Sequence, residues 1–340
     1  MNSFIAQLFS RQRIPGWRQL IQWGFVGWSL FLGIQFGLFV RYYQSGGQTL
    51  YYPRPPGVEA FLPIGALVSL KTWLLTGHFD TIHPAALVLF LTFLGLALLS
   101  KKSFCSWICP VGALEEGLWK GGRKLLGRNF KIWNGLDILL RVIKYLLLLF
   151  FLKLILLDMP PQALRGFLAS PYWAVADIRM LYFFTGMSLI SVTVIAVLGM
   201  LSVVYQNFWC RYLCPYGALL GVLSFFSPLK IRRREEHCIK CGDCSRVCPS
   251  RIDVQHKGSV CSVECTGCLT CVGHCPEADA LAMRLPLWKR PLPSWGFALV
   301  VLGLFCGGVA AGMLTGHWET SLDHLDYQRL VPIAERLGIS

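Results

Sequence analysis

The cysteines between residues 238 and 276 constrain this chain more than any other feature. They form two copies of one pattern, C-x2-C-x2-C-x3-C-P, joined by a short spacer. Three thiolates in a tight turn can hold three corners of an iron–sulfur cubane, and the proline ends that turn. In chains with two such copies, the fourth cysteine of each copy ligates the cluster of the other copy.

The pattern therefore predicts two [4Fe–4S] clusters with exchanged ligands in a ferredoxin-like segment. The ligands expected for the first cluster are Cys238, Cys241, Cys244 and Cys275. The ligands expected for the second cluster are Cys265, Cys268, Cys271 and Cys248. Structural zinc and disulfides are the alternatives, but zinc sites usually come as C-x2-C pairs with longer gaps. Two complete four-cysteine runs favour the clusters.

Composition places this segment in a membrane protein. Hydrophobic residues make up 54% of the chain and charged residues only 15%, whereas soluble domains carry about a quarter charged residues. The net charge of +14 is compatible with nucleic-acid binding, but in a membrane protein such an excess belongs to cytoplasmic loops. We expect no nucleic-acid partner. Most of the 14 cysteines stand in C-P motifs, which favours ligands in a reducing compartment over disulfides.

Five apolar stretches have about the length that a bilayer requires. They are residues 20–40, 84–100, 137–157, 183–205 and 294–315. Residues 58–76 are interrupted by Glu59, Pro63 and Lys71 and are predicted to be a re-entrant or interfacial segment. Residues 158–181 are predicted to be an outer loop. The distribution of Lys and Arg predicts a cytoplasmic cluster segment and a periplasmic C-terminal tail.

The predicted fold class is mainly α. It is a polytopic membrane helix bundle of about five spans and one re-entrant or interfacial segment, with an inserted α+β bacterial 2[4Fe–4S] ferredoxin domain. The predicted domains are a membrane domain (1–227), the ferredoxin-like domain (228–290), a last transmembrane helix (291–316) and a polar outer tail (317–340).

An internal repeat adds a second group of cysteines. An apolar stretch followed by C-x3-C-P-x-G-A-L occurs twice, with Cys105 and Cys109 in the first copy and Cys210 and Cys214 in the second. Residues i and i+4 share one face of a helix, so the four thiols are expected to form one site at the cytoplasmic membrane face. A third iron–sulfur cluster, copper(I) and a redox dithiol all remain open. The alternative is that these four cysteines are buried simply as small hydrophobic side chains.

Polar residues beside the interrupted segment suggest a further site. His78, Asp80 and His83 follow it, and polar groups at membrane depth are costly and tend to be functional. Because His titrates near neutral pH, His83 is the candidate proton acceptor of a quinone-facing site. A simple interfacial loop, or a haem ligated by such histidines, is the alternative. The chain has no C-x-x-C-H, G-x-G-x-x-G or Walker A motif, which excludes covalent haem and leaves no nucleotide-site candidate.

The motifs resemble those of membrane-bound polyferredoxins, the family typified by NapH, a quinol-dehydrogenase membrane subunit, and by the carboxy-terminal half of NosR. The resemblance rests on residues 104–110, residues 210–215 and the two four-cysteine runs, and covers most of residues 20–290. We expect no counterpart of the NosR flavin domain.

The resemblance implies an electron-transfer protein of the bacterial inner membrane. It implies an oxidoreductase subunit that carries electrons between the quinone pool or a cytoplasmic donor and a partner reductase. The implied partners are redox subunits, such as a periplasmic or cytoplasmic reductase, a ferredoxin or a cytochrome. The alternative is a copper-handling or metal-reducing assembly factor that uses its membrane-face thiols.

Overall fold

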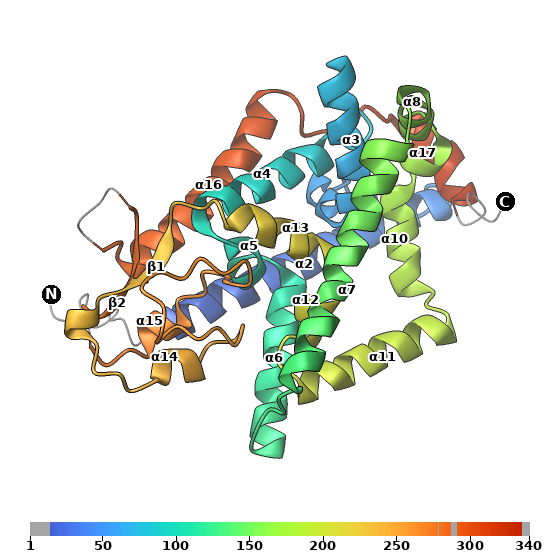
Figure 1. The fold of residues 1–340 in the computed structure, drawn as a ribbon. Helices are drawn as coiled ribbons and strands as arrows, with labels where there is room; N and C mark the ends of the chain where they lie inside the picture. Colours follow the sequence, from blue (N-terminus) through green and yellow to red (C-terminus); the bar gives the residue numbers. More distant parts are fainter. Residues whose placement is uncertain (1–13, 278, 287–290, 335–340) are drawn as a thin grey trace, which may run out of the picture. The chain divides into compact units, whose positions relative to one another are not determined.

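The computed structural model describes residues 14–277, 279–286 and 291–334 (Figure 1). The chain up to residue 13, the end of the predicted ferredoxin domain at 287–290 and the tail beyond residue 334 lie outside the described residues. The chain divides into two compact units, which are described separately. Unit 1 comprises Met1–Val26, Phe93–Leu148 and Ala196–Phe305, and unit 2 comprises Gly27–Thr92, Leu149–Ile195 and Cys306–Ser340.

The described chain is mainly helical, as predicted. The longer helices are α2 (Ile14–Gln44), α3 (Pro63–Thr76), α4 (Pro84–Ser100), α6 (Pro110–Leu126), α7 (Asn134–Leu152), α11 (Leu189–Val204) and α16 (Ser294–Leu314). The shorter α-helices are α5 (Ser103–Trp107), α8 (Pro161–Leu168), α9 (Pro171–Ala174), α10 (Ala176–Thr185), α12 (Phe208–Tyr212), α13 (Pro215–Ser224), α14 (Asp243–Arg246), α15 (Thr270–Gly273) and α17 (His324–Leu330). Four other turns are helical: η2 (Pro56–Phe61), the π-helix η3 (Lys153–Asp158), η4 (Glu235–His237) and η5 (Val331–Ile333).

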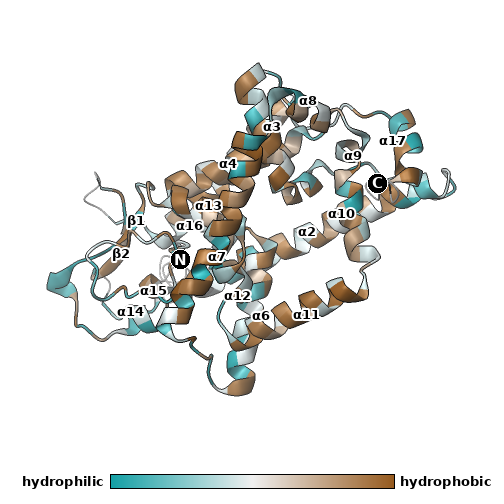
Figure 2. Cartoon of the chain, turned by 45° about the vertical axis from the view of Figure 1, so that its right-hand side comes forward, coloured by the Kyte–Doolittle hydropathy of each residue, from teal (hydrophilic) through white to brown (hydrophobic). Residues whose placement is uncertain are grey.

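Two helices of the described chain are long and apolar enough to cross a membrane, namely α2 and α16. The bent pair α10 and α11 makes a third if it is counted as one span, and α4 is a shorter apolar helix. Figure 2 shows hydrophobic residues along α4, α11 and α16. The number of five spans therefore stays a prediction. Helix α3 has 14 residues, fewer than the roughly 20 that span a bilayer.

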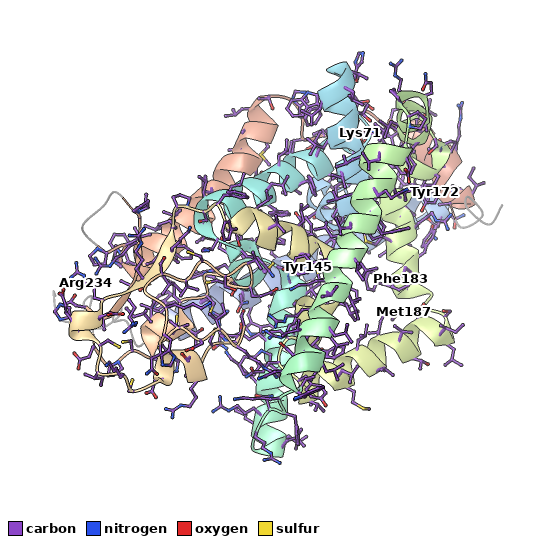
Figure 3. All side chains as sticks on the ribbon, in the orientation of Figure 1. Lys71, Tyr145, Tyr172, Phe183, Met187 and Arg234 are labelled. Atoms are coloured by element: carbon purple, nitrogen blue, oxygen red, sulfur yellow. The ribbon has the colours of Figure 1, made fainter. Side chains whose placement is uncertain are left out.

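The predicted span over 183–205 is not one straight helix, and its crossing of the membrane stays a prediction. The chain bends by 78° between α10 and α11, beside the labelled Phe183 and Met187 in Figure 3. The N–H of Gly186 donates to the carbonyl of Tyr182 and ends α10. The hydroxyl of Ser188 then accepts from the N–H of Ser191 at the start of α11, which is the usual role of a serine at a helix start.

The predicted outer loop at 158–181 contains α8, α9 and the first part of α10, and its place outside the membrane stays a prediction. Proline occupies the first position of α8 and of α9, where its missing N–H costs no helical hydrogen bond. The Ser170 hydroxyl caps α9 by accepting from the N–H of Trp173. In the same unit, the ammonium of Lys71 donates to the carbonyls of Ile155 (3.0 Å) and Met159 (2.6 Å) at the π-helical turn (Figure 3).

The core of unit 2 joins α2 to the C-terminal residues. Phe39 and Tyr43 of α2 pack with Val175, Ile178 and Tyr327. The predicted polar tail therefore contains a helix, α17, that contributes apolar side chains to this core. Asp323 begins α17 with a capping box.

The predicted α+β insertion lies in unit 1. Strand β1 (Lys230–Arg233) pairs antiparallel with β2 (Leu281–Arg284), and the short helices α14 and α15 lie between them in sequence. Gly242 precedes α14 with φ +80°, a left-handed conformation that glycine adopts without strain.

Trp173 is buried in unit 2 against α3, and Gly65 makes room for it. A Cβ at Gly65 would lie 2.1 Å from the Trp173 ring. We predict that Gly65→Ala destabilises the protein by about 1–3 kcal/mol through overpacking. Thermal unfolding in detergent measures the effect. Gly33→Ala is the matched control, since a Cβ there meets nothing within 4 Å and alanine favours the helix. Equal unfolding temperatures for the two variants would contradict this prediction.

Candidate metal centre

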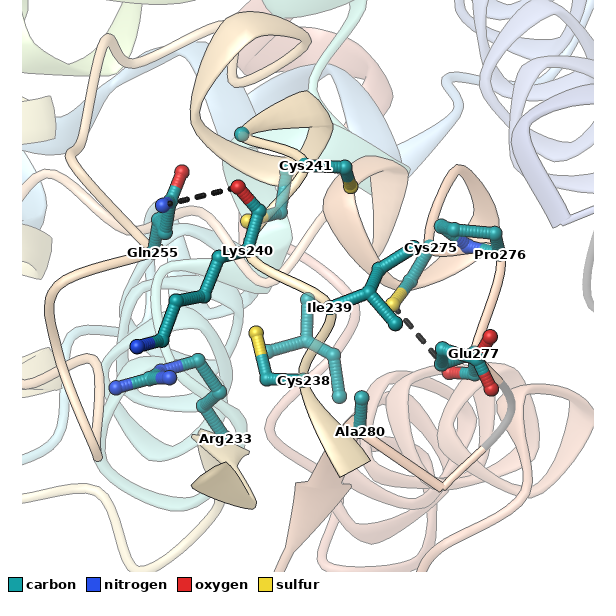
Figure 4. A pocket seen from close by; sticks show the side chains of 13 residues that line it. Arg233, Cys238, Ile239, Lys240, Cys241, Gln255, Cys275, Pro276, Glu277 and Ala280 are labelled. Atoms are coloured by element: carbon teal, nitrogen blue, oxygen red, sulfur yellow. Dashed lines mark hydrogen bonds between the residues drawn. The ribbon is translucent and has the colours of Figure 1, made fainter. Parts of the chain in front are cut away.

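Four cysteines of the ferredoxin segment line one pocket of unit 1. They are Cys238, Cys241, Cys244 and Cys275. Figure 4 shows Cys238, Cys241 and Cys275 around this pocket, with the Cys275 thiol bonded to the carbonyl of Glu277 (3.3 Å). Cys241 is exposed, so this first group lies near the protein surface.

The other four cysteines of the segment line a second pocket. They are Cys248, Cys265, Cys268 and Cys271. Cys265 and Cys271 are buried, and apolar side chains such as Val254 and Val260 share the lining. Cys248 lies with the cysteines of the second sequence copy, and Cys275 with those of the first.

The two groups are neighbours. A charge on Cys244 of the first group raises the pKa of Cys271 in the second, in addition to the larger effect of burial. Burial likewise raises the pKa of Cys248 to about 12. Thiols in such surroundings ionise only when a positive charge, such as that of bound metal, lies beside them.

The two C-x3-C-P repeats fold alike. In each, a short helix (α5 or α12) carries the first cysteine, and the second cysteine caps the helix that starts at the next proline (α6 or α13). The N–H of Gly217 donates to the sulfur of Cys214 (3.2 Å). At the matching position in the first repeat, a Cβ on Gly112 would lie 2.1 Å from the carbonyl oxygen of Cys105, so the turn needs glycine there.

The four repeat cysteines come together. Every pair among Cys105, Cys109, Cys210 and Cys214 is close enough for a charge on one thiol to raise the pKa of another. Burial is the largest influence and raises the pKa to about 12 for Cys105 and about 11 for Cys109. Four buried thiols can all become thiolates only with a compensating positive centre.

Both repeats hold the loops that carry the second cysteine group. Between Cys105 and Cys109, the Ser106 hydroxyl donates to the carbonyl of Thr266 (2.7 Å). The Trp107 indole donates to the carbonyl of Gly267 (3.2 Å).

Arg211 makes the corresponding contact from the second repeat. It donates to the carbonyl of Ser250 (2.8 Å), two residues after Cys248, and its guanidinium is fixed by Asp137. One pocket is lined by Cys105, Cys210 and Cys268. The repeat site therefore adjoins the second cysteine group.

Buried cations surround these thiols. Lys102 has an exposed fraction of 4%. Burial opposes its charge, but Glu264 and then Cys105 outweigh this and raise the pKa of Lys102. Glu264 also accepts two bonds from the ammonium of Lys144 (2.6 and 2.8 Å).

Lys101 provides the clearest test of whether the site fits a cluster. Its side chain is fully buried, and its Nζ has no hydrogen-bond partner among the described residues. Burial lowers the pKa of Lys101, whereas a charge on Cys265 raises it. An unpaired buried ammonium is costly, and an anionic cluster held by Cys265 would provide its counter-charge. The donor set therefore fits an iron–sulfur cluster.

A different arrangement is needed for a single metal ion. Within the described ranges, no group of three or more His, Cys, Asp or Glu side chains is arranged to hold one metal ion. A cubane has its irons at separate corners, so its thiolates stand farther apart than ligands that share one ion.

Sequence reasoning missed these buried charges. Lys101 and Lys102 follow an apolar stretch directly, as charged residues at the end of a membrane span do. Lys144 stands within an apolar stretch, which is typical of a lysine that extends its ammonium to the membrane surface. The available signal was Lys144 itself, because a lysine within an apolar helix tends to be paired and functional. Nothing in the sequence pointed to Glu264 as its partner.

His83 lies in unit 2 within a buried polar network. Its Nε2 is 2.8 Å from the Trp173 carbonyl, and its Nδ1 is 3.2 Å from both Glu59 and Arg54. Arg54 in turn donates to Asp177 (2.6 Å). Burial lowers the pKa of His83, but Glu59 and Asp177 outweigh this and raise it. His83 is fully buried, whereas His78 is exposed.

Comparisons with known proteins define the class. A family model described as a 4Fe-4S binding domain matches residues 82–132 and again residues 185–234, so it covers both C-x3-C-P repeats. A 4Fe-4S dicluster domain model matches residues 230–281. With its apolar helices, the chain is an iron–sulfur membrane protein.

The chain is 43% identical to the "Putative electron transport protein YccM" of Escherichia coli over 327 residues, which are 95% of this chain and 91% of that protein. It is 28% identical to the ferredoxin-type protein NapH of Escherichia coli, over 53% of this chain and 61% of NapH. It is 32% identical to the regulatory protein NosR of Pseudomonas aeruginosa, over 52% of this chain and 24% of NosR. No solved structure matches it.

The chain belongs to the membrane-bound polyferredoxin family that includes these proteins. The resemblance seen in the cysteine motifs is thereby confirmed.

The buried charge of Lys101 generates a prediction. We expect Lys101→Met to lower the midpoint potential of the cluster held by Cys265, because a nearby cation stabilises the more negative, reduced state. The expected shift is at least ~59 mV, a tenfold change in a one-electron equilibrium. A redox titration followed by paramagnetic resonance measures it. The exposed Lys124→Met is the matched control, and equal potentials in all three proteins would refute the prediction.

Proposed function

We propose that this protein is an electron-transfer subunit that passes electrons through three cysteine-held centres. The contacts of the repeats with the loops of the second cysteine group carry the proposal, because they join the three groups in one order. That order runs from the repeat site to the second ferredoxin group and then to the first. The surface position of Cys241 makes the first group the place where a soluble or subunit partner exchanges electrons.

In this proposal the repeat site holds a third iron–sulfur cluster. Cys105, Cys109, Cys210 and Cys214 are its ligands, and the ferredoxin cysteines hold two clusters in the exchanged grouping of Cys275 and Cys248. The match of both repeats to a 4Fe-4S binding domain favours this cofactor over copper or a dithiol. When bound, it supplies one-electron transfer, while Lys102 compensates its charge.

Replacing all four repeat cysteines with serine tests the third cluster. Three [4Fe–4S] clusters contain about 12 irons per chain, and two contain about 8. We therefore predict that anaerobically purified wild-type protein contains about 12 irons and the fourfold variant about 8. Metal analysis measures iron and copper together. A variant that keeps its full iron content, or a wild-type protein that carries copper at this site, would contradict the third cluster.

We further propose that quinol is the membrane-side reductant and that His83 takes part in accepting its protons. Oxidation of one quinol releases two electrons and two protons, so a proton-accepting group must accompany the electron path. Because His83 has no exposed surface, its protons would pass through the Glu59 carboxylate, 3.2 Å from its Nδ1. Arg54, paired with both Glu59 and Asp177, holds that carboxylate in place. With this role, the protein would be the membrane subunit that oxidises quinol for a larger reductase.

His83→Gln is expected to slow quinol-dependent cluster reduction by at least ~100-fold, the usual contribution of a proton-transfer group. Reduction by dithionite should be unchanged, because the clusters lie elsewhere in the chain. Stopped-flow spectroscopy measures both rates per reducible cluster. His78→Gln, which changes an exposed histidine five residues away, should behave as wild type. Normal quinol kinetics in His83→Gln would remove His83 from the mechanism.

We propose an inner-membrane protein with a cytoplasmic ferredoxin segment and a periplasmic C-terminal tail. The excess of Lys and Arg in and around the ferredoxin segment supports this orientation. A reporter fused after residue 340 should be active only as a periplasmic reporter. A cytoplasmic signal from that fusion would reverse the orientation.

A further inference from the structure

Four arginines line an open pocket beside the two-stranded sheet of unit 1. The pocket is lined by Arg232, Arg233, Arg234, Arg284, Gly258 and Ser259. No acidic side chain of the described residues lines it. Arg232 and Arg233 belong to β1, Arg234 follows it, and Arg284 ends β2. Arg234 is labelled in Figure 3.

The strand register places like charges together. Lys230 pairs directly with Arg284, and Arg232 stands two residues along the same strand. Directly opposite residues and their i+2 neighbours share one face of a sheet, and like charges at such positions destabilise it. Lys230 finds a partner in the Phe225 ring, 5.8 Å from its Nζ. An anion beside Arg232 and Arg284 would lower this repulsion.

Arg232 also has an unused donor. Its Nε is buried and has no hydrogen-bond partner among the described residues. Ser259 forms an isolated bridge with Arg232, and its hydroxyl accepts from the Cys261 thiol (3.9 Å), which leaves the hydroxyl hydrogen free to donate. A guanidinium fork with an adjacent hydroxyl suits the oxygens of a phosphate group.

The pocket lies close in sequence and in space to the start of an apolar helix. Leu292 donates its N–H to the carbonyl of Met283, next to Arg284 (2.9 Å). Two residues later Ser294 begins α16, a candidate membrane span. Phosphate groups of anionic lipids lie at the level where such helices leave the bilayer, and basic pockets there bind them.

We propose that the pocket formed by Arg232, Arg234 and Arg284 is a binding site for a phosphate group, supplied by an anionic lipid headgroup or by a soluble phosphate. Arg233 lines both this pocket and that of the first cysteine group, whereas Arg232, Arg234 and Arg284 line none of the cysteine pockets described above.

The full-length protein, purified and delipidated in a neutral detergent, tests the site. Native mass spectrometry measures binding of phosphatidylglycerol against phosphatidylcholine, and thermal unfolding measures stabilisation by inorganic phosphate. We expect Arg232→Gln to weaken phosphate-group binding at least about fivefold. Arg234→Gln, at an exposed position of the same pocket, is the second variant and should show the same loss if Arg232→Gln folds poorly. Arg123→Gln removes the same charge from an exposed position of α6 and should bind as wild type.

The lipid-binding and phosphate-binding measurements together identify the source of the phosphate group. Selective retention of phosphatidylglycerol, lost in the pocket variants, assigns a lipid. Saturable stabilisation by inorganic phosphate without lipid selectivity, lost in the same variants, assigns a soluble ligand. Wild-type binding by both Arg232→Gln and Arg234→Gln, or no binding of either ligand by the wild type, would overturn the proposal.

Discussion

Negative charge buried around iron and sulfur is the constraint on which the rest of unit 1 depends. Thiolates are costly to remove from water unless cations lie beside them. Unit 1 provides these cations at fixed positions. Lys101 lies near Cys265, and its Nζ has no hydrogen-bond partner within the part of the chain that the structure describes. Lys102 lies near the repeat thiols. Glu264 joins Lys102 to Lys144, so the position of each cation depends on the segment that carries the clusters.

The same constraint explains why the two repeats and the ferredoxin loops fold as one unit. Ser106 and Trp107 bind the loop of Cys265 and Cys268, and Arg211 binds the loop that follows Cys248. Each contact ends on a backbone carbonyl, which fixes the loop position without depending on the side chains of that loop. A cluster in one group would therefore be held rigidly relative to its neighbours, which is what efficient electron transfer requires.

The sequence predicts the local chemistry better than the three-dimensional arrangement. Cysteine spacing is read along the chain, because each run occupies one tight turn, and the two ferredoxin groups follow from it. The 78° break near Gly186 depends on two local hydrogen bonds within an otherwise apolar stretch, so hydropathy alone missed it. The burial of Lys101 and the pairing of Lys144 with Glu264 are long-range contacts that no local pattern encodes. The same holds for His83, whose partners Glu59 and Asp177 are distant in sequence.

The central claim is that three iron–sulfur centres lie next to one another in a fixed order. Paramagnetic resonance of the fully reduced wild-type protein tests it most directly, because neighbouring reduced clusters couple their spins. The account predicts split, interacting signals, with the middle cluster coupled to both others. Reduced signals that show no mutual broadening or splitting, as isolated clusters would give, would contradict it.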